Sequence, residues 1–255
     1  MDVNRIINVA TYAGKIMLEN GAEIYRVEET IVRICSAYGI YGVDTFVTIT
    51  VIMASAEQKY QQTISVVKRI KKRTLNIEKI SRVNDISRNI RNKGYTLEFV
   101  EDKLKNIDSM KPYSNKVNVV FSGMVAAFFT LVYGGNIRDF SIAFIIGCLI
   151  RIISIEFSSL ETNEFFINIL CGALTAVTAL SMVHFGIATN SDKIIIGSIM
   201  LLVPGLAITN AIRDTIAGDL ISGISRGIEA FLIAVAIAAG TGVVLKLWFN
   251  YFGGV

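Results

Sequence analysis

The chain has 255 residues, of which 53% are hydrophobic and 18% charged, and its mean hydropathy is +0.54. Soluble domains are about one quarter charged, so this composition excludes a disordered chain, a collagen-like repeat and a uniform soluble globule. Residues 1–116 hold 19 of the 25 Lys and Arg and 13 of the 21 Asp and Glu, a formal charge of +6, and the remaining 6 and 8 give residues 117–255 a charge of −2. We therefore expect a basic N-terminal domain, residues 1–116, followed by an apolar membrane domain, residues 117–255.

Three scattered cysteines and one histidine, at positions 35, 148, 171 and 184, form no pattern typical of a disulfide framework or a zinc site. We therefore predict no metal and no cofactor. The first residues do not resemble a cleaved secretory signal, because no apolar segment follows a basic start.

The N-terminal domain reads as α+β. Apolar residues at helical spacing predict two helices, and the second begins after the helix stop Asn20-Gly21. A β-branched run then predicts a strand, a turn and a return strand, and two further helices follow, with Thr96 as the N-cap of the last. The expected ranges are helices 4–20 and 22–38, strands 43–55 and 60–68, a third strand 73–77, and helices 81–92 and 96–107.

Residues 68–73 contain five basic side chains. They are interpreted as a solvated strand end, as a site of attraction to the anionic inner leaflet, or as a nucleic-acid-binding patch. The last reading is the weakest, because no aromatic residue lies among them and a membrane half follows.

Five segments are apolar enough to approach the ~20 residues that a membrane-spanning helix needs. Their connecting loops are short, so neighbouring helices should be antiparallel. Lys and Arg gather just before the first segment, and such residues mark cytoplasmic flanks. We expect a multi-span α-helical protein of the inner (cell) membrane, with a cytoplasmic N-terminus and, after five spans, an external C-terminus. The segments are residues 117–135, 140–157, 165–190, 194–212 and 227–252.

A first polar motif occupies residues 19–30. Glu23 and Arg26 are i,i+3 neighbours, as are Arg26 and Glu29, so an ion-pair ladder with helix capping is one interpretation. The functional alternative is a polar surface that faces a pore or a partner. The candidate residues are Glu19, Gly21, Glu23, Tyr25, Arg26 and Glu28.

A second motif begins with Pro204-Gly205, halfway along an apolar segment. Proline interrupts helical hydrogen bonding, and broken helices followed by polar residues occur at transporter substrate sites. A simple kink, and an i,i+3 pair of Arg226 with Glu229, are the structural alternatives. The fork of an arginine, Arg213 or Arg226, binds carboxylates, and the neighbouring acids could hold these arginines or exchange protons. The candidate residues are Pro204, Gly205, Thr209, Asn210, Arg213, Asp214, Asp219, Ser222, Arg226 and Glu229.

These two stretches, LENGAEIYRVEETIVRICSAYG from Leu18 and PGLAITNAIRDTIAGDLISGISRGIEA from Pro204, resemble the threonine/serine exporter family. Single-chain members carry a second membrane half after this one, whereas here the sequence stops at Val255. The chain is therefore similar to the larger subunit of the split form, including a two-component succinate exporter. The resemblance implies a smaller all-membrane partner and a substrate that is either a hydroxy-amino acid or a dicarboxylate.

The sequence thus predicts a subunit of a secondary exporter of small polar metabolites. It has no GxxxxGK[ST] loop, GxSxG elbow or HExxH pair, which disfavours ATP as the direct driver and an enzyme as the function. A membrane-embedded enzyme and a membrane-tethered sensor or scaffold remain the alternatives. The expected partners are the lipid bilayer, the smaller subunit and a small-molecule substrate, without nucleic acid; homo-oligomerisation stays open.

Overall fold

The computed structural model describes residues 2–58, 62–160 and 162–253. The chain forms two compact units. The first unit comprises Met1–Lys111 and Leu206–Gly227, and the second comprises Pro112–Gly205 and Ile228–Val255. A C-terminal segment thus belongs to the same unit as the N-terminal part of the chain.

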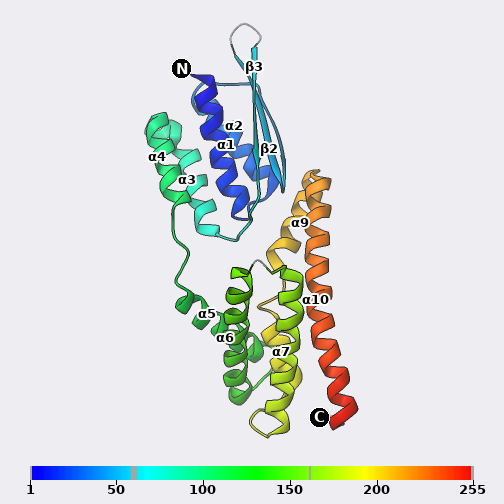
Figure 1. The fold of residues 1–255 in the computed structure, drawn as a ribbon. Helices are drawn as coiled ribbons and strands as arrows, with labels where there is room; N and C mark the ends of the chain where they lie inside the picture. The colour runs from blue at the N-terminus through cyan, green and yellow to red at the C-terminus, as the bar shows by residue number, and fades with distance from the viewer. Residues whose placement is uncertain (1, 59–61, 161, 254–255) are drawn as a thin grey trace. The chain divides into compact units, whose positions relative to one another are not determined.

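The first unit is built in layers (Figure 1). Helices α1 (Val3–Glu19) and α2 (Ile24–Ala37) pack on one face of a sheet, and α3 (Ile77–Lys93) and α4 (Leu97–Asp108) pack on α1 and α2. These helices confirm four predicted helices to within a few residues. The predicted N-cap is also confirmed, since the Thr96 hydroxyl accepts a hydrogen bond from the Phe99 amide at 3.3 Å.

The sheet has three antiparallel strands in the order β1 (Val43–Thr48), β2 (Val51–Gln58) and β3 (Gln62–Arg69). The hairpin between β2 and β3 is confirmed, although positions 60 and 61 of the predicted return strand lie outside the described residues. The single strand predicted at 43–55 is wrong. The segment forms two antiparallel strands, and the chain reverses between Thr48 and Val51, which pair with each other. The turn was not recognised because β-branched residues lie on both sides of it.

The predicted third strand at residues 73–77 is also wrong. This segment runs from the end of β3 to the start of α3 and hydrogen-bonds to the end of α1 instead of to a strand. The Thr74 amide donates to the Glu19 carbonyl at 2.7 Å, and the Asn76 amide donates to the Asn20 carbonyl at 3.1 Å.

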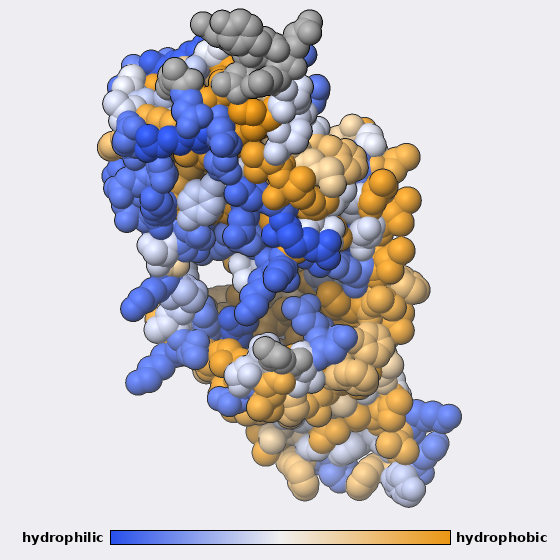
Figure 2. Space-filling model, turned by 45° about the horizontal axis from the view of Figure 1, so that its top comes forward, coloured by the Kyte–Doolittle hydropathy of each residue, from blue (hydrophilic) through white to orange (hydrophobic). Residues whose placement is uncertain are grey.

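The second unit is a helical bundle of α5 (Asn115–Val132), α6 (Ile137–Ser159), α7 (Glu164–His184), α8 (Ser191–Ile199) and most of α10 (Leu220–Phe252). Hydrophobic side chains dominate its visible surface, whereas hydrophilic ones gather on the first unit (Figure 2). Among the described residues, α5, α6, α7 and α10 are the four helices that are long and apolar enough to cross a membrane.

The predicted count of five spans is not confirmed, because the segment predicted at 194–212 is broken. Helix α8 ends at Ile199, and α9 (Gly205–Ala217) begins only after Pro204. Proline has no amide hydrogen and fits the start of a helix better than its interior. The helix break predicted from Pro204-Gly205 is therefore confirmed as an interruption between two short helices rather than a simple kink.

The two ends of the second unit are defined by different contacts. At one end, Asp139 at the start of α6 accepts hydrogen bonds from the Thr189 and Asn190 amides at 2.8 and 3.1 Å. His184, at the end of α7, packs its ring against Trp248 and Phe252, near the end of α10. At the other end, Asn115 and Lys116 of α5 line a groove with Glu156 of α6. The start of α5 and the end of α10 therefore lie at opposite ends of this unit.

Helices α5 and α6 approach closely through glycines. A Cβ atom added to Gly147 would lie 2.7 Å from the Ser122 carbonyl oxygen and 2.9 Å from the Gly123 Cα. Small residues allow such close packing between membrane helices. Backbone atoms cannot move aside as a flexible side chain can, so the contact tolerates no side chain.

We predict that Gly147→Ala lowers the melting temperature of the detergent-purified protein, because overpacking of this kind costs about 1–3 kcal/mol. Gly242→Ala in α10 is the matched control, since its added methyl group meets no atom within 4 Å among the described residues. It should be neutral or slightly stabilising. Equal melting temperatures for the two variants would contradict the close α5–α6 contact.

Candidate functional site

The structure brings the two predicted motifs together within the first unit. The loop between α1 and α2 contacts α9 and the first turns of α10 through polar groups. We call this arrangement the polar clasp. Its members are Gly21, Ala22, Glu23, Ile24, Asn210, Arg213, Asp214 and Arg226.

A buried ion pair forms the centre of the polar clasp. Asp214 is fully buried, and its Oδ2 lies 3.1 Å from Nε of Arg226, whose side chain is 9% exposed. Oδ1 of Asp214 accepts a hydrogen bond from the Ile24 amide at 3.1 Å. Nη2 of Arg226 donates to the Ala22 carbonyl at 2.8 Å. Both charged groups therefore bind the backbone of the α1–α2 loop as well as each other.

A second, more exposed set of contacts lies around Glu23. Its Oε1 is 2.6 Å from Nη1 of Arg213, and its Oε2 is 3.2 Å from Nε of Arg26. The predicted Glu23–Arg26 pair is thus confirmed. The Glu23 side chain is nearly buried, whereas that of Arg213 is 54% exposed. Arg213 is therefore the cation of the polar clasp that is open to a further ligand.

Local backbone geometry explains why the loop can receive these groups. Gly21 ends α1 with φ at +93°, a conformation that residues with a Cβ rarely adopt. Glu23 occupies the N-cap position of α2 without a capping hydrogen bond from its own side chain. The first amides of a helix have no partner within the helix. The Ile24 amide donates to the carboxylate of Asp214 instead, and this carboxylate lies at the positive end of the α2 dipole.

Asn210 completes the polar clasp by donating from Nδ2 to the Gly21 carbonyl at 3.0 Å. It shares the inward face of α9 with Asp214, and both are buried. The outward face of α9 carries exposed apolar side chains, Ile208, Ile212 and Ile216, of which Ile216 is 81% exposed. Helix α9 therefore has the reverse of the arrangement usual in soluble proteins. Its polar face packs against protein, and its apolar face is uncovered within the first unit.

Burial changes the acid strength of several carboxyl groups in the first unit. It raises the pKa of Asp214, although the Ile24 amide and the Arg226 guanidinium partly oppose the shift. Burial also raises the pKa of Asp219, in the turn before α10. The pKa of Glu28 is raised for the same reason, while its Oε1 accepts a hydrogen bond from the Val47 amide at 3.0 Å.

Other candidate residues lie outside the polar clasp. Tyr25 is 41% exposed, and Glu19 pairs with Lys15 at 3.7 Å. Ser222 is buried near the start of α10. Three further candidates, Pro204, Gly205 and Glu229, belong to the second unit, and Thr209 lies on α9.

Sequence reasoning allowed Asp214, among other acids, to hold Arg226, but it did not single out this pair. It missed the role of the backbone at Ala22 and Ile24. The i,i+3 rule connects only neighbours on one helix, whereas this pair joins α9 to α10. The one available signal was the occurrence of two polar motifs in otherwise apolar surroundings.

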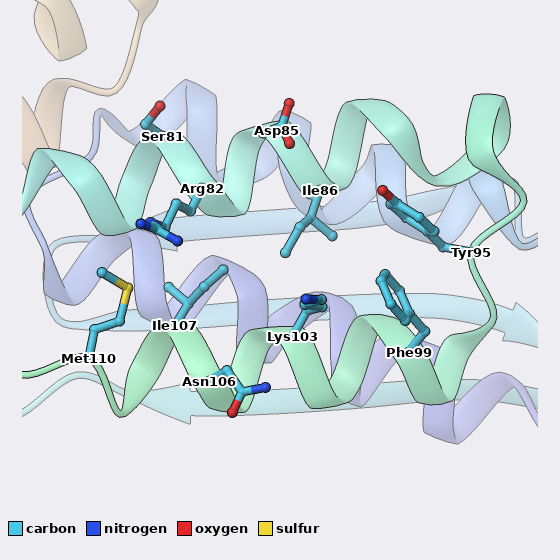
Figure 3. Close-up of a pocket in the computed structure, with 10 residues that line it drawn as sticks. All are labelled: Ser81, Arg82, Asp85, Ile86, Tyr95, Phe99, Lys103, Asn106, Ile107 and Met110. Carbon is cyan, nitrogen blue, oxygen red and sulfur yellow. The ribbon is translucent and has the colours of Figure 1, made fainter.

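The first unit also has an open groove of about 790 Å³ between α3 and α4. Tyr95 and Phe99 face each other at its loop end, with ring centroids 4.5 Å apart, and Lys103 projects beside Phe99 (Figure 3). None of the predicted site residues lines this groove. Within residues 2–58, 62–160 and 162–253, no group of three or more His, Cys, Asp or Glu residues is placed to hold a metal ion.

Comparison with known proteins identifies similar sequences. Residues 8–248 match the family described as "Putative threonine/serine exporter". A threonine/serine exporter of Corynebacterium glutamicum is 26% identical over 250 residues, covering 95% of this chain and 51% of that protein. The chain thus spans about half the length of this relative. No solved structure gives a significant match.

Two further relatives are named "Probable succinate transporter subunit YjjP". The Escherichia coli protein is 23% identical over 248 residues, which cover 95% of this chain and 94% of that protein. The Klebsiella aerogenes protein is 23% identical over 234 residues, which cover 91% and 90%.

We predict that Asp214→Asn strongly destabilises the protein, because breaking a buried ion pair costs about 3–5 kcal/mol. Arg213→Gln is the matched control. Its pair with Glu23 is half exposed, and such pairs contribute about 0–1 kcal/mol. Thermal melting of the full-length protein in detergent measures both variants. Similar melting temperatures for Asp214→Asn and the unmodified chain would show that the buried pair does not hold the polar clasp together.

Proposed function

Since the chain belongs to the threonine/serine exporter family, we propose that it is the larger subunit of a secondary-active exporter of small polar metabolites. The family and the relatives are transporters, so the chain is a membrane transport protein rather than an enzyme. The proposed substrates are threonine/serine-type amino acids or dicarboxylates such as succinate, the classes that the names of the relatives contain.

The proposed partner is a smaller membrane subunit. Two relatives that this chain covers almost completely are named as transporter subunits, which supports an assembly of more than one chain. The uncovered apolar face of α9, with Ile208, Ile212 and Ile216, offers a surface that another membrane chain or lipid would have to cover.

The observation that carries the proposed mechanism is the half-exposed guanidinium of Arg213 beside a buried ion pair. All the proposed substrates carry a carboxylate, and an arginine fork binds a carboxylate through two parallel hydrogen bonds. We assign to Arg213 the role of binding the substrate. Its guanidinium would release the Glu23 carboxylate and bind the carboxylate of the incoming substrate. Arg226 is buried and bonded to the Ala22 carbonyl, so its proposed role is to hold the loop.

Proton coupling is the proposed energy source. Asp214 and Asp219 have pKa values raised by burial, which brings their proton exchange closer to neutral pH. Protonation of Asp214 would weaken its attraction to Arg226 and so loosen the polar clasp. Glu229, in the second unit, is a further candidate carrier.

We also propose that the N-terminus is cytoplasmic and the C-terminus external. The excess of Lys and Arg before α5 supports the first point. The second is supported by the contacts of His184 with Trp248 and Phe252, because these place the end of α10 away from the start of α5.

Flux measurements test the function itself. We predict that proteoliposomes containing this chain with its smaller partner transport labelled threonine or succinate when a proton gradient is imposed. Proteoliposomes containing this chain alone should not. The same proteoliposomes with the proton gradient reversed serve as the control for leak. Transport by the purified chain alone would overturn the two-subunit proposal, and absence of transport in both preparations would favour a sensor or scaffold.

Conservative arginine variants test the proposed roles. We predict that Arg213→Lys raises the apparent KM about tenfold, with unchanged protein levels, because lysine keeps the charge but loses the fork. Arg226→Lys should lower the melting temperature and leave the apparent KM of the remaining protein nearly unchanged. The reverse pattern would exchange the two roles, and an unchanged KM in Arg213→Lys would remove Arg213 from the substrate site.

A further inference from the structure

We propose that residues 69–77, from the last residue of β3 to the first residue of α3, form a docking surface for the headgroups of anionic phospholipids. We call this segment the basic loop. It goes beyond the transport function, because it concerns how the first unit is held at a membrane surface rather than how the substrate moves.

Charge and exposure define the surface. Lys71, Lys72 and Arg73 are consecutive and exposed. They are followed by two exposed apolar side chains, Leu75 at 59% and Ile77 at 62%. Cations that attract an anionic leaflet, next to aliphatic side chains that enter the headgroup boundary, are the combination found in proteins that bind membrane surfaces.

The basic loop is held in place by its backbone. The Ile70 amide donates to the Thr50 carbonyl at 2.9 Å, and the Ile70 side chain is buried. The amides of Thr74 and Asn76 donate to the end of α1. Little conformational freedom is therefore lost on binding, and the cations are presented together on one edge of the first unit.

Two of the three connections to the apolar helices leave the first unit beside the basic loop. Next to the basic loop, Nζ of Lys79 donates to the Asp108 carbonyl at 2.7 Å, three residues before the unit ends at Lys111. The Asn20 carbonyl binds the basic loop, and the Ala22 carbonyl, two residues later, binds Arg226 of α10. The chain thus leaves the first unit for α5 and for the apolar part of α10 beside this loop.

Three nearby acids pair with cations outside the basic loop. Glu19 pairs with Lys15, and Glu23 pairs with Arg213 and Arg26. Glu78 pairs with Arg82 at 2.7 Å. A nucleic acid is a weaker match than lipid, because such sites stack bases on aromatic side chains and residues 68–77 contain none.

The test uses the full chain in nanodiscs of phosphatidylcholine, with or without phosphatidylglycerol. A bimane fluorophore is attached to Leu75→Cys after Cys35, Cys148 and Cys171 are replaced by alanine. We expect a blue shift, and quenching by brominated lipid, only in the anionic discs and only at low salt. Lys71→Gln with Lys72→Gln should weaken this association roughly thirtyfold, since each basic residue near an anionic surface contributes about 1 kcal/mol.

Two matched variants make the result decisive. Lys71→Arg with Lys72→Arg keeps the charge and should behave as the parent. Arg88→Gln with Lys93→Gln removes the same charge from the opposite end of α3, where both residues are exposed, and should retain the blue shift. Equal spectra in neutral and anionic discs would overturn the proposal. So would an equal loss in the Arg88/Lys93 variant, or a stronger response to added RNA than to anionic lipid.

Discussion

Charged groups that are removed from water need other charges or hydrogen bonds as partners. The buried pair of Asp214 and Arg226 must find these partners within the first unit. The pair is matched by the backbone of the α1–α2 loop, at Ile24 and Ala22. That loop can offer its backbone because Gly21 turns sharply and because α2 begins without a cap from its own sequence. The association of a C-terminal segment with an N-terminal domain follows from these few polar contacts.

The same requirement explains the inverted character of α9. A helix in a soluble domain turns its apolar stripe inward, yet α9 turns Asn210 and Asp214 inward and leaves Ile212 and Ile216 uncovered. Helix α10 has 33 residues, about 50 Å at 1.5 Å per residue, which exceeds the ~30 Å hydrocarbon core of a bilayer. Its first turns thus extend beyond one membrane span, which allows them to belong to the first unit.

Helical periodicity was the most informative signal in the sequence. It located α1, α2, α3 and α4, and Thr96 was identified as a cap because its side chain acts on its own helix. The β1–β2 reversal was missed, because it lies among β-branched residues and hydropathy does not record chain direction. The break at Pro204-Gly205 was identified from the proline, but the segment around it was still counted as one membrane span. Residues 73–77 have strand-like composition but find their hydrogen-bond partners at the end of α1.

The candidate site was predictable only in part, for a similar reason. Glu23 and Arg26 are close in sequence, so helical spacing identified their pair. Asp214 and Ile24 are 190 positions apart, and their contact depends on tertiary structure. The sequence did contain both halves of the polar clasp as polar motifs, but nothing in either motif specified that one would bind the other's backbone.

This separation has a consequence for biogenesis. A ribosome adds about 5–20 residues per second, so roughly 10–40 s pass between synthesis of the α1–α2 loop and synthesis of α9. During that interval α5, α6, α7 and α8 must leave the ribosome and enter their apolar surroundings. The Ala22 carbonyl and the Ile24 amide meanwhile form hydrogen bonds with water. The N-terminal domain is thus completed last, although its sequence is translated first, and any chain released before Arg226 exposes an unfinished surface to the cell's quality control.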